Sequence, residues 1–201
     1  MDIIIKLLII VLANIFIINR LDILNKKFNI NVFFFFTNLT IIIAMFYYLF
    51  ELVFVPFLEI KLAIVLYIFL VMIIYNFILV PKAKKDKANH DFYSVYDIIA
   101  HIIIPILILI DWIFLTKSKH ISKLVLLMFS IYPILYSLIV FIKAEKKLGK
   151  PFKHSNNHYP YFFFEIDKYG VKKIMVNLLV LIILMLLIGY IFLLINNYLL
   201  I

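Results

Sequence analysis

Three polar residues inside apolar segments have the types and spacing needed for nucleophilic chemistry. His101 follows Asp97 by four residues, so their side chains share one face of a helix, one turn apart. A carboxylate that accepts a hydrogen bond from one imidazole nitrogen leaves the other nitrogen as a base. Thr37 lies at the same depth in another apolar segment, and a hydroxyl becomes a nucleophile beside such a base. The pattern predicts Thr37 as nucleophile, His101 as base and Asp97 as the residue that orients His101.

The surroundings of His101 add to this prediction but leave alternatives open. Pro105 cannot donate the hydrogen bond that the carbonyl of His101 would accept, so the backbone there should bend and hold a free acceptor. Alternatively, His101 only bonds a neighbouring helix, and the two threonines only bond the carbonyl four residues back. Whether Thr37 or Thr40 faces His101 also stays open.

Further polar and aromatic residues are predicted to line a substrate cavity. They accompany Thr37, flank Pro133, or belong to the aromatic run YPYFFF before the last apolar segment; they are Asn38, Thr40, Tyr132, Tyr136, Tyr159 and Tyr161. The aromatic run is typical of a belt at the membrane interface. A lid over the mouth of the cavity is the alternative interpretation.

Two other charged residues in the apolar segments are given no chemical role. Asp111 lies ten residues after His101, about 80° away around the helix and some 15 Å along it. With the neighbouring Trp112 it is expected to anchor the helix at the membrane interface. Lys6 lies near a helix end and is expected to extend its ammonium to the membrane surface.

The residue counts exclude several kinds of site. The chain has no cysteine, so thiolate metal centres and disulfides are absent, and three glycines cannot form a nucleotide-binding loop. His154 and His158 are four residues apart but have no cysteine or acidic residue nearby, as a metal site would need. We therefore predict neither a metal nor a cofactor.

The composition places the chain in a membrane. Of 201 residues, 67% are apolar and 15% are charged, and the mean hydropathy is +1.14. A soluble domain is about 45–50% apolar and about 25% charged. Six segments have the roughly 20 apolar residues that a membrane-crossing helix needs; they are 3–19, 30–50, 60–80, 94–115, 121–142 and 174–195. The sequence thus predicts an all-α fold, a polytopic membrane bundle of six transmembrane helices that forms one domain over residues 1–201.

Basic residues are distributed unevenly between the two predicted sides of the membrane. The segments that follow the first, third and fifth spans hold fifteen of the twenty Lys and Arg residues. This bias predicts that these loops are cytoplasmic. The net charge of +9 points to anionic lipid headgroups as partners of these lysine-rich loops, rather than to nucleic acid. The sequence does not indicate an oligomeric state.

Three motifs resemble one family of membrane proteins. FFFFTNLT (33–40), DIIAHIIIPILILIDW (97–112) and YPILYSLIVF (132–141) with YPYFFFEIDKYGVKKIMVN (159–177) resemble the bacterial six-span Pr-six-Pr proteins. That family is similar to the androgen-induced membrane hydrolases. The resemblance implies an integral protein of the bacterial plasma membrane. It also implies a threonine hydrolase of fatty acid esters of hydroxy fatty acids, with Thr37 as nucleophile and His101 as the histidine. Asp97 stands where the family often has Asn.

The sequence supports two functional hypotheses. The first is an integral membrane hydrolase of lipid esters that uses a threonine nucleophile and a histidine base within the bilayer. The second is a small membrane protein without enzymatic activity, such as a transporter, a channel or an assembly partner.

Overall fold

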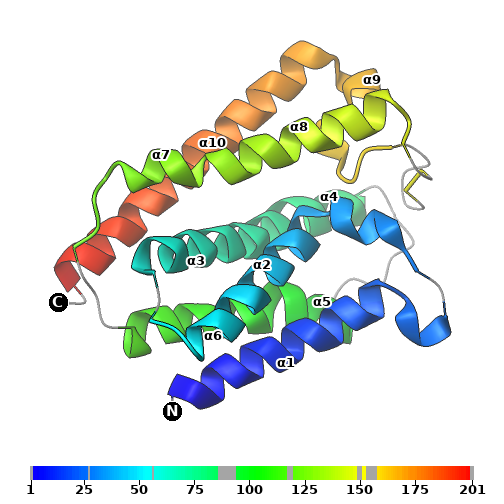
Figure 1. The fold of residues 1–201 in the computed structure, drawn as a ribbon. Coiled ribbons are helices and arrows are strands. Elements are labelled where there is room, and N and C mark those ends of the chain that lie inside the picture. Colours follow the sequence, from blue (N-terminus) through cyan, green and yellow to red (C-terminus); the bar gives the residue numbers. More distant parts are fainter. Residues whose placement is uncertain are drawn as a thin grey trace.

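The chain is built from helices throughout the described residues. The computed structural model describes residues 2–26, 28–55, 57–85, 94–116, 120–148, 151–152 and 158–199, and these ranges contain no strand (Figure 1). Five helices in them are long and apolar enough to cross a membrane; they are Asp2–Arg20, Leu58–Lys85, Val95–Leu115, Val125–Glu145 and Val171–Tyr198. The predicted all-helical membrane fold is confirmed.

Several of these long helices change their winding along their length. Each is continuous in space but divides into shorter elements. These are α3 (Leu58–Ile73), the π-helical η3 (Ile74–Leu79) and α4 (Val80–Lys85); α5 (Val95–Ile98), the π-helical η4 (Ile99–Ile103), α6 (Ile104–Ile110) and the π-helical η5 (Asp111–Leu115); α7 (Val125–Phe129) and α8 (Ile131–Glu145); and α10 (Val171–Leu194) with the π-helical η7 (Ile195–Leu199). The fifth long helix, α1 (Asp2–Arg20), is α-helical throughout. Short 3₁₀ turns η1 (Ile23–Asn25) and η6 (Phe162–Phe164) and the one-turn helix α9 (Ile166–Tyr169) lie between them.

The second predicted span is shorter than expected. It starts as a 3₁₀ helix, η2 (Ile30–Phe34), and only then becomes α2 (Phe36–Glu51). The buried amide of Asn38 donates a 2.9 Å hydrogen bond to the carbonyl of Val32 and holds the two elements together. Sixteen residues of α2 extend about 24 Å, less than the roughly 30 Å of a bilayer core. The count of six spans therefore stays a prediction.

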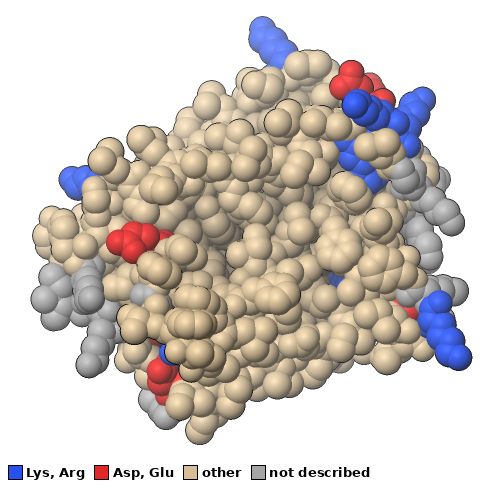
Figure 2. Space-filling model, viewed as in Figure 1, with Lys and Arg blue, Asp and Glu red and all other residues tan. Residues whose placement is uncertain are grey.

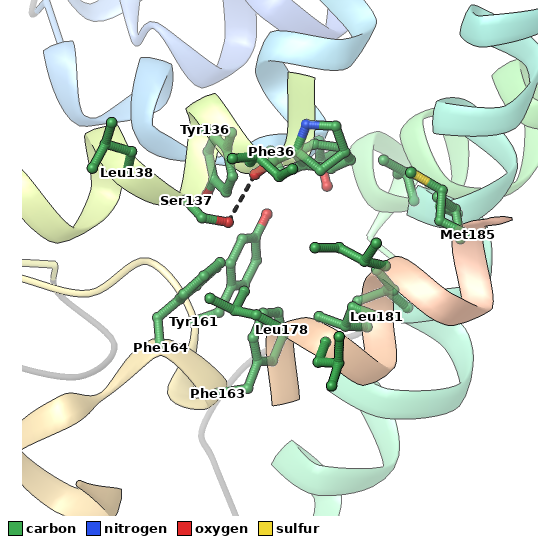
Figure 3. Close-up of a pocket in the computed structure, with 18 of the residues that line it drawn as sticks. Phe36, Tyr136, Ser137, Leu138, Tyr161, Phe163, Phe164, Leu178, Leu181 and Met185 are labelled. Atoms are coloured by element: carbon green, nitrogen blue, oxygen red, sulfur yellow. Dashed lines mark hydrogen bonds between the residues drawn. The ribbon is translucent and has the colours of Figure 1, made fainter. Parts of the chain in front are cut away.

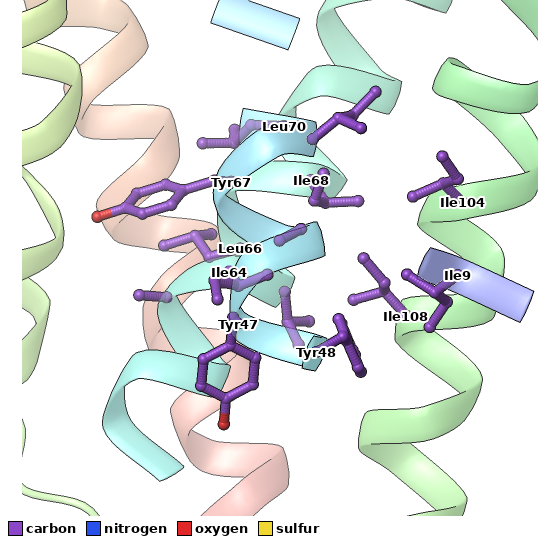
Figure 4. Packing of buried hydrophobic residues seen from close by; sticks show 14 of the residues in the cluster. Ile9, Tyr47, Tyr48, Ile64, Leu66, Tyr67, Ile68, Leu70, Ile104 and Ile108 are labelled. Atoms are coloured by element: carbon purple, nitrogen blue, oxygen red, sulfur yellow. The ribbon is translucent and has the colours of Figure 1, made fainter. Parts of the chain in front are cut away.

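The helix α3 forms the centre of the molecule. Ten of its sixteen residues are buried, and it packs against α2, α6 and α10. Figure 4 shows Ile64, Leu66 and Ile68 of α3 among the side chains of neighbouring helices. The helix α1 packs on α2 and α6, whereas α7 contacts α8 and α10. The structure thus has one well-packed group of helices and a further pair, α8 and α10, beside it (Figure 1).

Candidate functional site

An apolar cavity of about 350 Å³ lies between α3, α8 and α10 (Figure 3). Leu70 and Val71 of α3, Leu178 of α10, and Phe163 and Phe164 of η6 are on its wall. Its polar groups are few; they come from Thr37, Tyr75, Tyr136, Ser137 and Tyr161. A cavity of this kind suits a hydrocarbon chain with a small polar group.

The cavity opens sideways between α8 and α10. Four of its lining residues are about half exposed: Ile134 (49%) and Leu138 (53%) on α8, and Met175 (59%) and Leu179 (58%) on α10. These helices are among those that are apolar and long enough to cross a membrane. The opening therefore faces the side of the molecule that contacts lipid chains.

Thr37 lies in the first turn of α2 and on the cavity wall. The first N–H groups of a helix have no partner within it. The Tyr161 phenol lies near this turn, where the backbone N–H groups of Phe36 and Thr37 and the Thr37 side chain favour its ionised form and burial opposes it. Tyr161 belongs to the segment before α9, and burial raises the pKa of its phenol. The phenol therefore remains protonated at neutral pH.

His101 lies in the π-helical turn η4 and is buried. Its Nδ1 is 2.9 Å from the carbonyl oxygen of Asp97. A carbonyl only accepts, so Nδ1 carries the proton and Nε2 carries the lone pair of a base. The carbonyl of His101 accepts a 3.3 Å hydrogen bond from Asn76 Nδ2.

Tyr75 connects the histidine to the cavity. Its ring stacks on the His101 imidazole at 3.5 Å between centroids, with 9° between the planes. Tyr75 and Thr37 both lie on the cavity wall, whereas His101 is not among the lining residues. Thr37 thus lies on the cavity wall, whereas His101 lies against the Tyr75 ring and does not line the cavity.

The carboxylate of Asp97 has a different partner from the predicted one. It pairs with the guanidinium of Arg20, and it accepts a 2.7 Å hydrogen bond from the hydroxyl of Ser94. His101 is instead held by the backbone carbonyl of Asp97. Asp97 still fixes the imidazole, but through its main chain, because Arg20 from α1 reaches its carboxylate.

The other predicted cavity residues divide into two groups. Tyr136 and Tyr161 are on the cavity wall. Thr40 donates to the carbonyl of Phe36 at 2.7 Å and lies 3.1 Å from the Tyr132 hydroxyl. Asn38 joins η2 to α2, as described above, and Tyr159 is buried in an aromatic cluster with Tyr161. Thr40, Tyr132, Asn38 and Tyr159 therefore support the site from behind and do not line the cavity.

Sequence reasoning missed a buried ionic network at the end of the bundle where α1 begins. The Lys61 ammonium lies 2.8 Å from Glu51 Oε1 and 2.6 Å from Asp111 Oδ2. Tyr48 donates a 3.0 Å hydrogen bond to Asp111, and Lys6 lies 3.2 Å from Glu51. Asp111 is fully buried, and Lys6 is buried too. The expectation of an interfacial anchor at Asp111 is wrong. Lys6 joins this network and also lies 3.1 Å from Asp2 Oδ2 at the start of the helix, so its reach to the membrane surface stays a prediction.

A signal for this network was present in the sequence. Lys6, Glu51, Lys61 and Asp111 all lie near the same predicted end of their spans, and their charges balance. Opposite charges at one depth in a membrane bundle pair with each other.

The described residues hold no group of three or more His, Asp, Glu or Cys side chains that could bind a metal ion. His154 lies outside the described residues, as do Lys87, Lys150 and Lys153 of the lysine-rich loops.

In the space-filling view, Lys and Arg gather mainly at the end of the molecule where α8 ends and α9 lies, and a broad uncharged face adjoins them (Figure 2).

Comparisons with known proteins give no match: no family model, no curated protein and no solved structure is similar to this chain. Membership of the six-span family stays a prediction from the motifs.

Proposed function

We propose that this integral membrane protein binds a lipid acyl chain in the cavity and hydrolyses the attached ester, with Thr37 as the nucleophile. One observation carries the proposal: the Thr37 hydroxyl lies on the wall of an apolar cavity that opens between α8 and α10. Its volume of about 350 Å³ falls within the roughly 300–1,000 Å³ of small-molecule sites. Hydrocarbon fits the apolar wall, and the ester fits the hydroxyl groups of Thr37 and Tyr161.

The first chemical step is acyl transfer to threonine. The Thr37 hydroxyl oxygen attacks the ester carbonyl carbon, the hydroxyl proton passes to a base, and the ester C–O bond breaks as the alcohol takes that proton. Water then hydrolyses the acyl-threonine and releases the fatty acid. His101 is the proposed base, because its Nε2 has the free lone pair. Because the Tyr75 ring covers the imidazole, the proposal requires this ring to turn aside when the ester enters.

The start of α2 supplies the donors for the negative charge that develops on the carbonyl oxygen. The backbone N–H groups of Phe36 and Thr37 both act on the Tyr161 phenol and favour its negative form. An ester carbonyl oxygen in the same place would receive these two donors and the favourable end of the helix dipole. In this proposal Tyr161 occupies the oxyanion position until the substrate displaces it.

The proposal is tested by covalent labelling of the wild-type protein. A fluorophosphonate probe with an alkyl chain is added to the protein in detergent micelles, and the labelled residue is identified by peptide mass spectrometry. We expect the label on Thr37. No label, or a label on Thr40 or Ser137 instead, contradicts the assignment.

The cavity itself is tested by filling it. Leu178→Trp places a large ring against the cavity wall, so we expect the affinity for a fluorescent fatty acid to fall at least about tenfold. Leu187→Trp is the matched control, because Leu187 is an exposed residue of the same helix and does not line the cavity. The affinity of this control variant for the fatty acid should stay within about twofold of the wild-type value. Equal losses in the two variants would refute the role of the cavity.

A second candidate is lipid binding without chemistry, as in a transporter, a channel or an assembly partner. It is favoured by one observation: the Tyr75 ring covers the His101 imidazole, and His101 does not line the cavity that Thr37 lines. Fatty acid binding by the wild-type protein without labelling or ester turnover selects this candidate. In either case we place the lysine-rich end in the cytoplasm, from the distribution of basic residues.

A further inference from the structure

The ammonium group of Lys143 is buried without a hydrogen-bond acceptor. Lys143, in the last turn of α8, is 1% exposed, and its Nζ has no hydrogen-bond partner among the described residues. Two aromatic rings surround it: the ring centroid of Phe152 lies 4.3 Å from Nζ and that of Phe34 lies 4.9 Å from it. Ring faces attract the positive charge but do not replace oxygen acceptors for three N–H donors. A buried charge without acceptors is costly, which indicates that a bound group completes this site.

Lys143 lies beyond one end of the cavity. It follows Tyr136 by seven residues, so it is on the same face of α8 and about 10 Å further along the helix axis. Tyr136 lines the cavity and donates a 2.8 Å hydrogen bond to the carbonyl of Phe34, one of the rings around Lys143. Figure 3 shows Tyr136, Tyr161 and Phe164 together and away from Met185. A molecule that extends from the cavity past these aromatic residues therefore reaches the ammonium.

We propose that Lys143 binds the negatively charged head group of a lipid whose acyl chain occupies the cavity. The shared chemistry is an oxyanion, either a phosphate or a carboxylate, whose oxygens accept the unused N–H donors. The rings of Phe34 and Phe152 keep water away, which strengthens the charge pair. This proposal rests on the acyl-chain binding of the proposed function but not on ester cleavage.

Lysines on the surface near this site offer a matched control. Lys146 and Lys147 follow Lys143 on the same segment but are exposed. Surface lysines attract anionic membranes in proportion to their number and without a fixed geometry. If such diffuse attraction were the only cause of a preference for anionic lipids, replacing Lys146 would lower that preference as much as replacing Lys143.

The test measures which lipids the full-length protein retains. The protein in micelles is mixed with equal amounts of phosphatidylglycerol and phosphatidylcholine of identical chains, and the bound lipids are counted by native mass spectrometry. We expect the wild type and Lys146→Met to prefer phosphatidylglycerol at least about tenfold, and Lys143→Met to show no preference. Lys143→Arg, which keeps the positive charge, should retain part of the preference for phosphatidylglycerol. A preference unchanged in Lys143→Met, or lost equally in Lys146→Met, overturns the proposal.

A parallel arm with oleate and methyl oleate identifies the source of the oxyanion. A Lys143-dependent preference for oleate alone assigns a carboxylate, and one for phosphatidylglycerol alone assigns a phosphate; either supports the site. Lys143→Met should not lower the thermal midpoint, because methionine fills the space without a buried charge. A large fall in that midpoint together with the lost preference overturns a binding role.

The failures of the two proposals can be told apart. A wild-type protein without ester turnover but with a Lys143-dependent preference refutes the hydrolase and supports the anion site. A wild-type protein that retains neither phospholipid and binds no oleate overturns both the acyl-chain cavity and the anion site.

Discussion

Replacing Thr37 by alanine is expected to lower the turnover of a lipid ester by at least about 10³-fold, because it removes the proposed nucleophile. The alanine leaves the cavity wall and the Phe36 and Thr37 N–H groups in place, so binding of the fatty acid product should change little. Turnover is measured as fatty acid release from a monoacylglycerol in mixed micelles, and product affinity is measured separately. Thr37→Ser, which restores a hydroxyl, should recover part of the rate.

Thr40→Ala is the matched control for this prediction. Thr40 is one turn further along the same helix, but its hydroxyl bonds the Phe36 carbonyl and the Tyr132 hydroxyl behind the cavity. We expect its turnover to stay within about threefold of the wild type. If Thr37→Ala kept full turnover, or if both variants lost it equally, Thr37 would not be the nucleophile.

Replacing Lys61 by methionine is expected to destabilise the protein by about 3–5 kcal/mol, the largest effect on stability that we predict. Lys61 pairs with both Glu51 and Asp111 inside the bundle, and its loss leaves two buried carboxylates without their main counter-charge. The free energy of unfolding is measured by titration with a denaturing detergent. Adding Asp111→Asn to Lys61→Met should recover part of the loss, since it removes one of the unpaired charges.

An exposed lysine provides the control for this charge effect. Lys123 lies outside the network and is exposed. Lys123→Met removes the same group from the surface and should change the free energy of unfolding by no more than about 0.5 kcal/mol. A Lys61→Met variant as stable as Lys123→Met would mean that the network contributes nothing to stability.

The sequence predicts the positions of the long helices well, but it predicts poorly which helices pack against each other. The predicted span 60–80 lies within the observed helix Leu58–Lys85, and 94–115 closely matches Val95–Leu115, because the length of an apolar run is set by the membrane itself. The winding near Pro105 is also local: π-helical turns lie on both sides of the α-helix Ile104–Ile110. These features depend only on residues within a few turns of each other.

Contacts between distant segments account for what the sequence left open. Arg20 is 77 residues from Asp97, and it takes the carboxylate that the spacing of Asp97 and His101 assigned to the imidazole. Hydropathy gives the depth of a residue in a span, but not which helices are neighbours or how each is rotated. For the same reason the contact of the Tyr75 ring with the imidazole could not be predicted.

The opening between α8 and α10 has a consequence for how the protein meets its ligand. A molecule that enters there comes from the plane of the membrane and not from water, so its supply depends on its mole fraction among the lipids. Diluting the ester with an inert detergent, at constant amounts of protein and ester, should then slow the reaction, whereas adding more buffer should not. The reaction rate would depend on the mole fraction of the ester in the micelle or membrane. An affinity expressed as a molar concentration would therefore change with the amount of detergent.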